Sequence, residues 1–428
     1  MTLYSDFLAL DSLGGGSVVG SFTPVESLVL EYQVQPSTTA GLDLLVRRTG
    51  WVSDLIGERT AAGAVVDSLE SALGSAPVSP STLRWHAMLM ELENQSQLDA
   101  LSAESLHMLQ YDTPLGASRM LSMGYFIDRQ MADQFAGHLR EAASEHSGAG
   151  EPRRYAWAQP VFLRIQEDAD GAGLAEQRHS LAGVHTGYAM GADDLTLGFA
   201  GFIGTTDSSG DALSVGGTSV GAQAGARMQF FGKGGLQPWL SADVSYSRHS
   251  VRMERKDSYG NTAFARSLAQ VVSARGTAGA DVALGSAWQV SPFVGIRQSF
   301  VAMRSYTESC EDMLSPLYRV SPRDFHHAQG TAGLISRLEL TPWATWEAEV
   351  EYAAGLDAEK PTLHASGVDL PGFSADFRND TFARNTVSLA SRVMLYRDRE
   401  MQCSVGYNTT FSDGHREQGA SISVGIGF

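Results

Sequence analysis

Three glutamates and a set of arginines form the clearest pattern of ionisable side chains in this sequence, and the pattern indicates ion pairing. Residues 345–352 read TWEAEVEY, so Glu347, Glu349 and Glu351 share one face of a predicted strand, and apolar side chains take the other. Three carboxylates in a row would suffer a heavy desolvation penalty in a dry core. A water-filled interior with facing arginines tolerates them, although the solvated face of an ordinary sheet explains them equally well strand by strand. The charges that we assign to an inward face are Arg227, Arg275, Arg297, Arg337, Glu339, Glu347, Glu349, Glu351 and Arg392.

Two further motifs suggest a metal site or catalysis, and both are incomplete. His326 and His327 stand beside Asp324 in a predicted long loop, but no third ligand has a fitting spacing, so we predict a solvated loop. The tetrapeptide LDSL at 10–13 is similar to the GDSL motif of esterases, but Leu10 stands where that motif requires glycine. We therefore predict no enzymatic activity, no metal and no cofactor.

The composition excludes other classes of protein. The chain of 428 residues carries 31 basic and 48 acidic side chains, a net charge of −17, and lacks the basic stripe that nucleic-acid binding needs. No uncharged apolar run reaches about 18 residues, which excludes a transmembrane helix. Cys310 and Cys403 are expected to lie too far apart for a disulfide. Residues 1–10 lack the basic region of a signal peptide, so we expect either a cytoplasmic protein or the tail of a longer gene product.

The elements predicted before residue 150 are mainly helical. Strand-like alternation at 27–34 and 41–47 is followed by helical patterns at 51–73 and 81–110. A long amphipathic pattern then predicts a helix over about 118–146, with apolar residues at three- and four-residue steps and charged residues on other faces. Such a helix would be about 40 Å long, enough to cross an apolar band of about 25 Å. The residues assigned to it are Met120, Met123, Ile127, Arg129, Met131, Asp133, Phe135 and Arg140.

After residue 154 the hydrophobic period changes from 3.6 to 2. In the last segment, QGASISVGIGF, apolar side chains occupy one face, and glycine and serine occupy the other. The same pattern predicts twelve strands, centred near 155–166, 179–189, 195–205, 219–231, 236–253, 267–284, 288–306, 327–340, 345–355, 386–396, 401–412 and 418–428.

The pattern of turns favours a closed membrane barrel over a soluble sandwich. Short turns, such as 191–194, alternate with long polar ones, such as 308–324 and 357–379. Outer-membrane barrels have short turns at one end, long loops at the other and an even number of strands. A soluble sheet would leave the apolar strip of these strands uncovered, because no helices follow to pack on it.

Four stretches resemble the C-terminal translocator of bacterial autotransporters, the type V secretion family. QLDALSAE at 97–104 is similar to the helical LSGE-type segment that precedes the barrel, with Ala103 where glycine is common. WAQPV at 157–161 resembles the opening of the first strand, and LAGVHTGY at 181–188 resembles the second. The terminal SVGIGF resembles the family's final signature, and the likeness covers roughly residues 40–428.

The resemblance implies a mostly β protein: a 12-stranded antiparallel transmembrane β-barrel in the bacterial outer membrane, with an N-terminal α-helix through its lumen. It implies export of an N-terminal passenger to the cell surface, with membrane lipid, the passenger, periplasmic chaperones and the barrel-assembly machinery as partners. We divide the chain into a passenger remnant at 1–80, a helical linker at 81–150 and the barrel at 154–428. The residues that the assembly machinery would read are Ile422, Val424, Ile426 and Phe428.

Two alternatives stay open at this point. The helix predicted at 118–146 could pack on the one at 81–110 instead of threading the barrel, and the barrel could be a passive pore or surface anchor without export. Some family members cleave their passenger at an Asn in the pore helix. Because residues 95–150 contain no Asn, we expect the passenger to stay attached or to be released by another protease.

Overall fold

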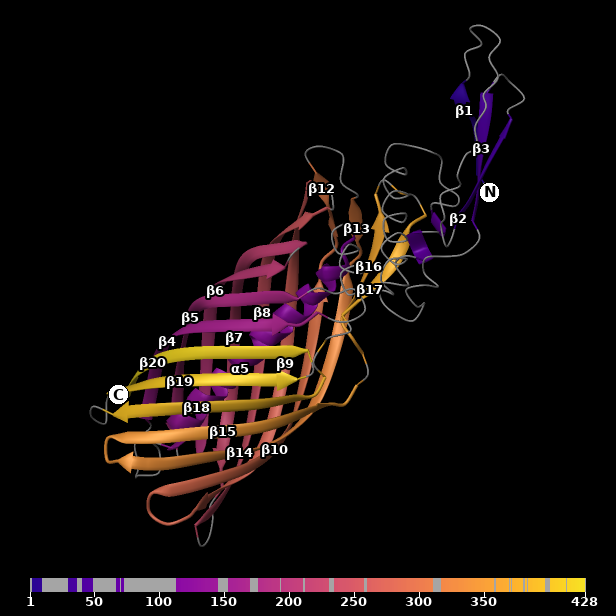
Figure 1. The fold of residues 1–428 in the computed structure, drawn as a ribbon. Helices are drawn as coiled ribbons and strands as arrows, with labels where there is room; N and C mark the ends of the chain where they lie inside the picture. Colours follow the sequence, from indigo (N-terminus) through magenta and orange to yellow (C-terminus); the bar gives the residue numbers. More distant parts are fainter. Residues whose placement is uncertain are drawn as a thin grey trace.

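The protein is a closed β-barrel with a helix inside it (Figure 1). The computed structural model describes residues 2–9, 30–36, 41–48, 67–69, 71–72, 113–144, 153–169 and, with gaps of at most six residues, 176–427. Twelve long strands alternate in direction: β4 (Arg153–Glu167), β5 (Gln177–Ala192), β6 (Leu195–Gly210), β7 (Leu213–Gln229), β8 (Leu236–Lys256), β9 (Thr262–Ala283), β10 (Trp288–Met303), β14 (Arg323–Thr341), β15 (Ala344–Gly355), β18 (Thr386–Tyr396), β19 (Met401–Ser412) and β20 (His415–Gly427).

The barrel closes between its first and last strands. β20 pairs antiparallel with β4, for example Ala420 with Phe162, and β9 pairs with β10, so each of the twelve strands has two neighbours. The sequence prediction of a twelve-stranded antiparallel barrel is therefore confirmed. Closure leaves no free edge among these strands, which is what a bilayer requires of a β structure.

The outer face of the barrel is apolar and the inner face is polar, as the period of two predicts. Phe199, Ile203 and Val294 point outward and are each 60% exposed. Their strand neighbours Ala200 and Phe202 point inward and are buried. Among the described residues no helix has the length and apolarity needed to cross a bilayer.

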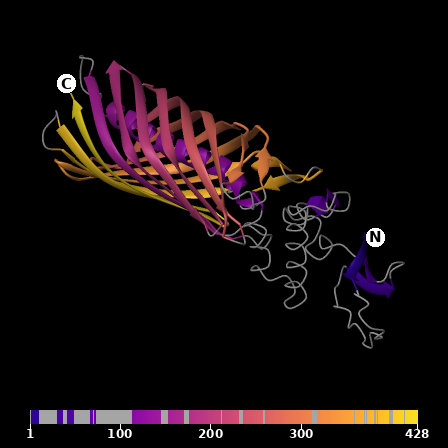
Figure 2. The same cartoon turned by 90° about the horizontal axis from the view of Figure 1, so that it is seen from above.

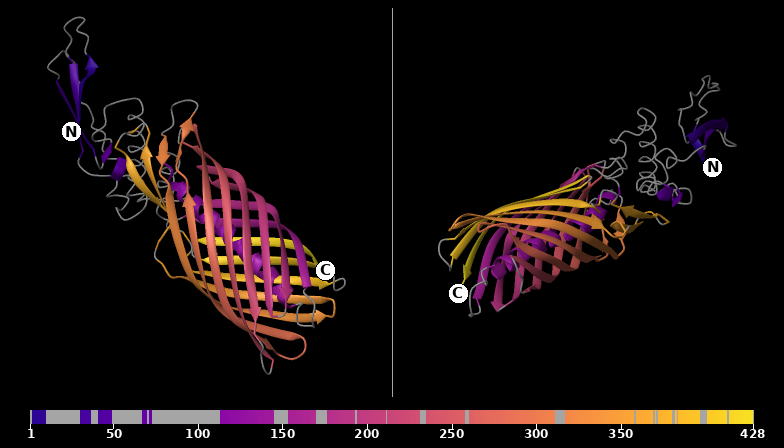
Figure 3. Two further views of the ribbon diagram at one scale, coloured as in Figure 1. Left: turned by 180° about the vertical axis from the view of Figure 1, so that it is seen from behind. Right: turned by 90° about the horizontal axis from the view of Figure 1, so that it is seen from below.

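One helix, α5 (Arg119–Ser144), follows the short 3-10 helix η1 (Leu115–Ser118) and runs along the inside of the barrel. Figures 2 and 3 show it threaded through the ring of strands from one mouth to the other. At 1.5 Å per residue its 26 residues extend for about 39 Å. The bounds agree with the helix predicted at 118–146, and the alternative, packing outside the barrel on a helix at 81–110, is not what the structure has.

A four-stranded sheet covers one end of the barrel, which we call the capped mouth. It consists of β11 (Tyr306–Thr307), β13 (Tyr318–Val320), β16 (Thr362–Gly367) and β17 (Ser374–Arg378), while β12 (Ser309–Cys310) pairs antiparallel with the first residues of β9. The connections at 308–324 and 357–379 are therefore long, as predicted, but parts of both are strand rather than loop. Buried and more exposed side chains alternate along these short strands as well. The buried ones include Tyr318, Val320, Leu363, Ala365 and Phe377.

The strands also extend further toward the capped mouth than the sequence predicted. β7 begins at Leu213 rather than 219, and β14 begins at Arg323 rather than 327. His326 and His327 therefore lie in a strand and not in a solvated loop. The period of two simply continues through them, because Phe325 and His327 face inward while His326 is exposed.

The N-terminal part contains a separate three-stranded sheet. β1 (Thr2–Ala9), β3 (Gly41–Arg48) and β2 (Leu30–Pro36) pair antiparallel in that order. β2 and β3 overlap the two strands predicted there, whereas β1 was not predicted. Of the predicted helices at 51–73 and 81–110, only 67–69 and 71–72 are described, as helix; the rest, the LSGE-like segment and Phe428 lie outside the described residues.

Candidate functional site

The apolar side chains of α5 form the centre of the lumen. Each of the five apolar residues assigned from the sequence is at most 1% exposed. Four of them join one cluster with wall residues of the barrel, including Val161, Val251 and Val271, whereas the fifth, Phe135, packs near Trp157. These five are Met120, Met123, Ile127, Met131 and Phe135. The stripe is thus a packing surface between helix and wall.

The first turn of α5 is tied to the wall by a buried carboxylate, Glu167 of β4. Ser122 donates to its Oε1 at 3.2 Å, and Asn379 Nδ2 donates to the same oxygen at 3.0 Å. His179 Nε2 lies 3.1 Å from Oε2. Arg119 adds a hydrogen bond from Nη1 to the Glu167 carbonyl at 3.3 Å. The start of the helix is therefore held by hydrogen bonds from three separate parts of the chain.

A second buried carboxylate, Glu417 of β20, pairs with Arg129 of α5. The two side chains form an ion pair with exposed fractions of 2% and 0%. Gln130 Nε2 donates to Glu417 Oε2 at 2.9 Å, and His415 Nε2 lies 2.7 Å from Oε1. His415 also stacks on Phe126 with ring centroids 4.0 Å apart. Arg129, predicted to point away from the apolar stripe, points at the wall.

Near the middle of the barrel, Asp133 bridges two wall arginines. Its Oδ1 accepts from Arg275 Nη1 at 2.7 Å and from Arg297 Nη2 at 2.5 Å. Arg275 also donates from Nε to Asp243 Oδ2 at 2.9 Å. Two arginines and two carboxylates thus balance in a cluster that joins α5 to β8, β9 and β10.

Toward the opposite end, Arg140 of α5 meets the glutamate row. Its Nη2 lies 2.9 Å from Glu349 and 3.3 Å from Glu347. Arg392 is 3.1 Å from Glu347 and 3.3 Å from Glu141 of the helix. The register of β15 and β18 places Glu347 opposite Arg392 in the wall. This wall pair contacts Arg140 and Glu141 of the helix, so acidic and basic groups from both sides form one cluster.

Two polar helix residues that the sequence did not single out also contact the wall. Asp128 Oδ2 accepts from Ser245 at 2.8 Å and from Ser273 at 2.7 Å. His138 Nε2 lies 2.7 Å from Gln159 Oε1. Both helix residues are at most 2% exposed. The wall therefore satisfies buried polar groups of the helix by hydrogen bonds from serine and glutamine side chains as well as by ion pairs.

The other inward charges assigned from the sequence are also on the inner face, but they do not all touch α5. Arg227 lies over the ring of Trp239, with its Cζ 3.9 Å from the centroid, and Asp281 Oδ2 is 3.6 Å from its Nη2. Arg337 stands opposite Glu347 in the register of β14 and β15. Glu351 is 8% exposed; the ninth charge of the set, Glu339, is exposed near the end of its strand.

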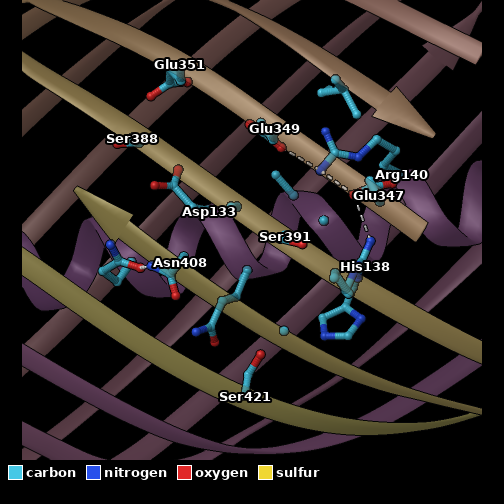
Figure 4. Close-up of a pocket in the computed structure, with 18 of the residues that line it drawn as sticks. Asp133, His138, Arg140, Glu347, Glu349, Glu351, Ser388, Ser391, Asn408 and Ser421 are labelled. Atoms are coloured by element: carbon cyan, nitrogen blue, oxygen red, sulfur yellow. Dashed lines mark hydrogen bonds and ion pairs between the residues drawn. The ribbon is translucent and has the colours of Figure 1, made fainter. Parts of the chain in front are cut away.

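A cavity of about 160 Å³ lies beside the second half of α5. Asp133, His138 and Arg140 line it from the helix, and the glutamate row lines it from β15. Figure 4 shows these side chains facing the same space, with Asn408 of β19 and Ser421 of β20 two and three strands further along the wall from β15. Trp239, Phe293 and Ile335 also line it, so the cavity combines apolar side chains with charges, amides and hydroxyls that can hydrogen-bond water.

The capped mouth carries a further buried ion pair. Arg255 Nη2 donates to Glu308 Oε2 at 2.7 Å, and the guanidinium lies 5.2 Å from the centre of the Tyr318 ring. Burial raises the pKa of the neighbouring Tyr306 above its usual value, and the Glu308 charge raises it further. The mouth is therefore sealed by packing and by paired charges around the point where α5 begins.

Sequence reasoning missed the most buried carboxylates of the site, Glu167 and Glu417. A signal was present, because both fall at inward positions of their strands: Glu417 lies two residues from the polar inward residue His415, and Glu167 continues the inward series of Leu163 and Ile165. They were passed over because each is near a predicted strand end, where a charge usually marks the solvent. The longer strands of the structure bring them inside.

Three of the four residues assigned as an assembly signal lie on the outer face of β20; the fourth, Phe428, is outside the described residues. Ile422, Val424 and Ile426 are 53%, 40% and 53% exposed and follow each other along the strand. The pairing of β20 with β4 places them next to the barrel seam. A continuous apolar row at the last strand suits contact with lipid.

Comparison with known proteins identifies the family. A family model described as the autotransporter beta-domain matches residues 156–421, which is most of the barrel. This chain belongs to that family. A search of curated proteins found no match.

Solved autotransporter barrels are similar in structure. The translocator domain of NalP from Neisseria meningitidis aligns with a TM-score of 0.53 at 14% identity, covering 69% of this chain and 95% of that one. The transport unit of AIDA-I from Escherichia coli gives 0.42 at 14% identity over 68% and 96%. The beta domain of Bordetella BrkA gives 0.41 at 15% identity over 64% and 98%. The NalP likeness supports the fold, and membership of the family supports a translocator role in the outer membrane.

Proposed function

We propose that this autotransporter barrel exports an N-terminal passenger segment and anchors it at the bacterial cell surface. The observation that carries the proposal is α5 inside a closed barrel: the chain before it leaves at the capped mouth, and the last strand ends at the opposite mouth (Figure 1). A chain exported through its own barrel would finish in this arrangement, with its last translocated segment still in the lumen.

The charges of the lumen support the same proposal. Arg129, Asp133 and Arg140 of α5 each meet a wall group of opposite charge. These pairs would hold the helix in place after export, and the polar wall would hydrate an extended chain before it. We assign 1–80 to the C-terminal part of the passenger, 81–150 to the linker with the pore helix, and 154–428 to the translocator.

The proposed partners follow from the outer surface and from the family. The apolar outer face would contact membrane lipid, and the row Ile422, Val424 and Ile426 with Phe428 would be read by periplasmic chaperones and the barrel-assembly machinery. Since residues 95–150 contain no Asn, the passenger would remain attached unless another protease releases it.

The experiment is to fuse a signal peptide and a small epitope-tagged reporter ahead of Met1 and to produce the chain in a Gram-negative host. We expect the epitope to be accessible to antibody on intact cells. A matched fusion that lacks 154–428 should leave it in the periplasm. An epitope that stays inside intact cells, with the barrel correctly folded in the outer membrane, would contradict the proposal.

A second candidate function is a passive pore or surface anchor without export, and the cavity of about 160 Å³ beside α5 favours it. Planar-bilayer conductance of the full chain distinguishes the two. A plugged translocator should pass small ions weakly, whereas a diffusion pore should conduct freely with the helix present.

A further inference from the structure

A cluster of basic side chains lies on the lipid-facing side of the barrel, next to the capped mouth. β8 carries Arg248, Arg252 and Lys256 at every second outward position. Arg266 lies on the adjoining face of β9, and Arg304 follows the end of β10, where its N–H donates to the Leu268 carbonyl at 2.9 Å. All five are exposed, and we call them the rim cluster.

The rim cluster contains an unfavourable pairing. The register of β8 and β9 places Arg252 directly opposite Arg266 on the same face. Like charges directly opposite each other in neighbouring strands destabilise a sheet. Acids on this face are fewer: Glu254, which is 3.4 Å from Arg252, Asp324 of β14, and Asp207 of β6, which lies in the same cross-strand row as Arg252 beyond Gly216 of β7. Among the residues that the structure describes, Arg248, Arg266 and Arg304 have no ion-pair partner.

The rim cluster lies next to the lipid-facing apolar band of the barrel, which favours a lipid headgroup as its ligand. Tyr246, two residues before Arg248 on the same face, and its neighbour Val272 are 44% and 50% exposed and belong to the apolar band. Arg248 therefore lies at the edge of the apolar band, and Arg252 and Arg266 lie beyond it, on the headgroup side. Guanidinium groups bind phosphate through paired, charge-assisted hydrogen bonds.

We infer that the rim cluster on β8, β9 and the end of β10 binds the phosphorylated headgroup of a lipid in the outer leaflet, with Arg252 and Arg266 sharing one phosphate between them. The assignment to the outer leaflet rests on the proposed function, which places the capped mouth outside the cell. The bound phosphate would remove the repulsion between the two arginines and fix this side of the barrel at a defined depth in the membrane.

The test uses the full chain in phosphatidylcholine nanodiscs that contain either a bisphosphorylated glucosamine lipid or its dephosphorylated form. Native mass spectrometry counts bound lipid, and titration gives the affinity. The double variant R252Q/R266Q should bind the phosphorylated lipid about fivefold more weakly for each arginine removed. The matched control is Arg178→Gln, because Arg178 is also exposed at the capped end but is paired with Glu176 at 2.6 Å; its affinity should not change.

Two further measurements distinguish a lipid site from a free-phosphate site and from a folding defect. Inorganic phosphate at millimolar concentration should not displace the lipid; displacement would mean a free-phosphate site and would overturn the inference. Equal binding of the dephosphorylated lipid, or an equal loss in the Arg178→Gln control, would also overturn it. In lipid-free zwitterionic detergent the double variant should unfold at the same temperature as the parent or higher, which excludes misfolding as the cause of lost binding.

Lipid binding at the rim cluster is independent of export. A barrel that fails to display its reporter can still bind the phosphorylated lipid in nanodiscs, and a barrel that exports normally can fail to bind it. The first result would contradict the proposed function alone, and the second would contradict the rim cluster alone.

Discussion

The two halves of α5 meet different surroundings. In the half near the capped mouth, Arg129 and its partner Glu417 are 2% and 0% exposed, and aromatic rings surround them. In the other half, Asp133 is 35% exposed, Arg140 is 19% exposed and its partner Glu349 is 26% exposed, around a cavity of about 160 Å³. The helix is therefore tightly packed near the capped mouth, in what we call the sealed half, and borders a cavity toward the other mouth, in what we call the hydrated half, so equal charge changes should have unequal effects.

The largest change is expected in channel conductance when the helix is removed altogether. Deleting 115–148 empties the lumen, because the apolar stripe and its paired charges leave together. Single-channel conductance should rise severalfold above that of the full chain, while the folded barrel persists in heat-modifiability gels. A folded barrel with unchanged conductance would mean that α5 does not block the pore.

The next effect is expected in the sealed half. Arg129→Met leaves Glu417 as a buried charge without its arginine, and breaking such a pair typically costs about 3–5 kcal/mol. Chemical unfolding in detergent should show this loss in the free energy of unfolding. The control R129M/E417Q removes both charges and should recover most of the stability; a double variant as unstable as the single one would refute the pairing.

A smaller effect is expected at the centre of the lumen. Asp133→Asn keeps the shape of the side chain but removes the charge shared by Arg275 and Arg297. Because Arg275 retains Asp243, we expect a loss of about 1–2 kcal/mol in the free energy of unfolding. A loss as large as that of Arg129→Met would erase the distinction between the two halves.

The smallest effect is expected beside the cavity. Arg140→Gln removes its ion pairs with Glu347 and Glu349. Because Glu347 keeps Arg392 and Glu349 is 26% exposed, we expect this variant to lose only about 0.5–1 kcal/mol in the free energy of unfolding. Its unfolding transition should nearly coincide with that of the parent, while the open-channel current noise changes because a wall charge loses its partner. A large destabilisation here would show that the hydrated half anchors the helix.

The sequence was sufficient for the barrel because a period of two survives in each strand. TWEAEVEY predicted both faces of β15, and register then brought Glu347 opposite Arg392. The sequence was not sufficient to predict the buried contacts of α5 in the sealed half. Glu167 and Glu417 become partners of the helix only after the barrel closes, since β4 and β20 lie at the two ends of the chain that forms it.

The capped mouth could not be predicted for a related reason. β13 is three residues long, and its partner β16 lies more than forty residues later in the chain, so each strand alone gives too short a pattern to recognise. The polar helix residues Asp128 and His138 were missed because their partners are single serine and glutamine side chains of distant strands.

Proteolysis of intact cells tests whether α5 lies inside the barrel while the residues before it are outside the cell. External protease should release peptides from residues before 113, and mass spectrometry should find a protected fragment that retains α5 and the strands up to β20. Protection of the upstream residues until the outer membrane is opened, or a barrel in untreated cells whose N-terminus lies inside 115–150, would contradict the account.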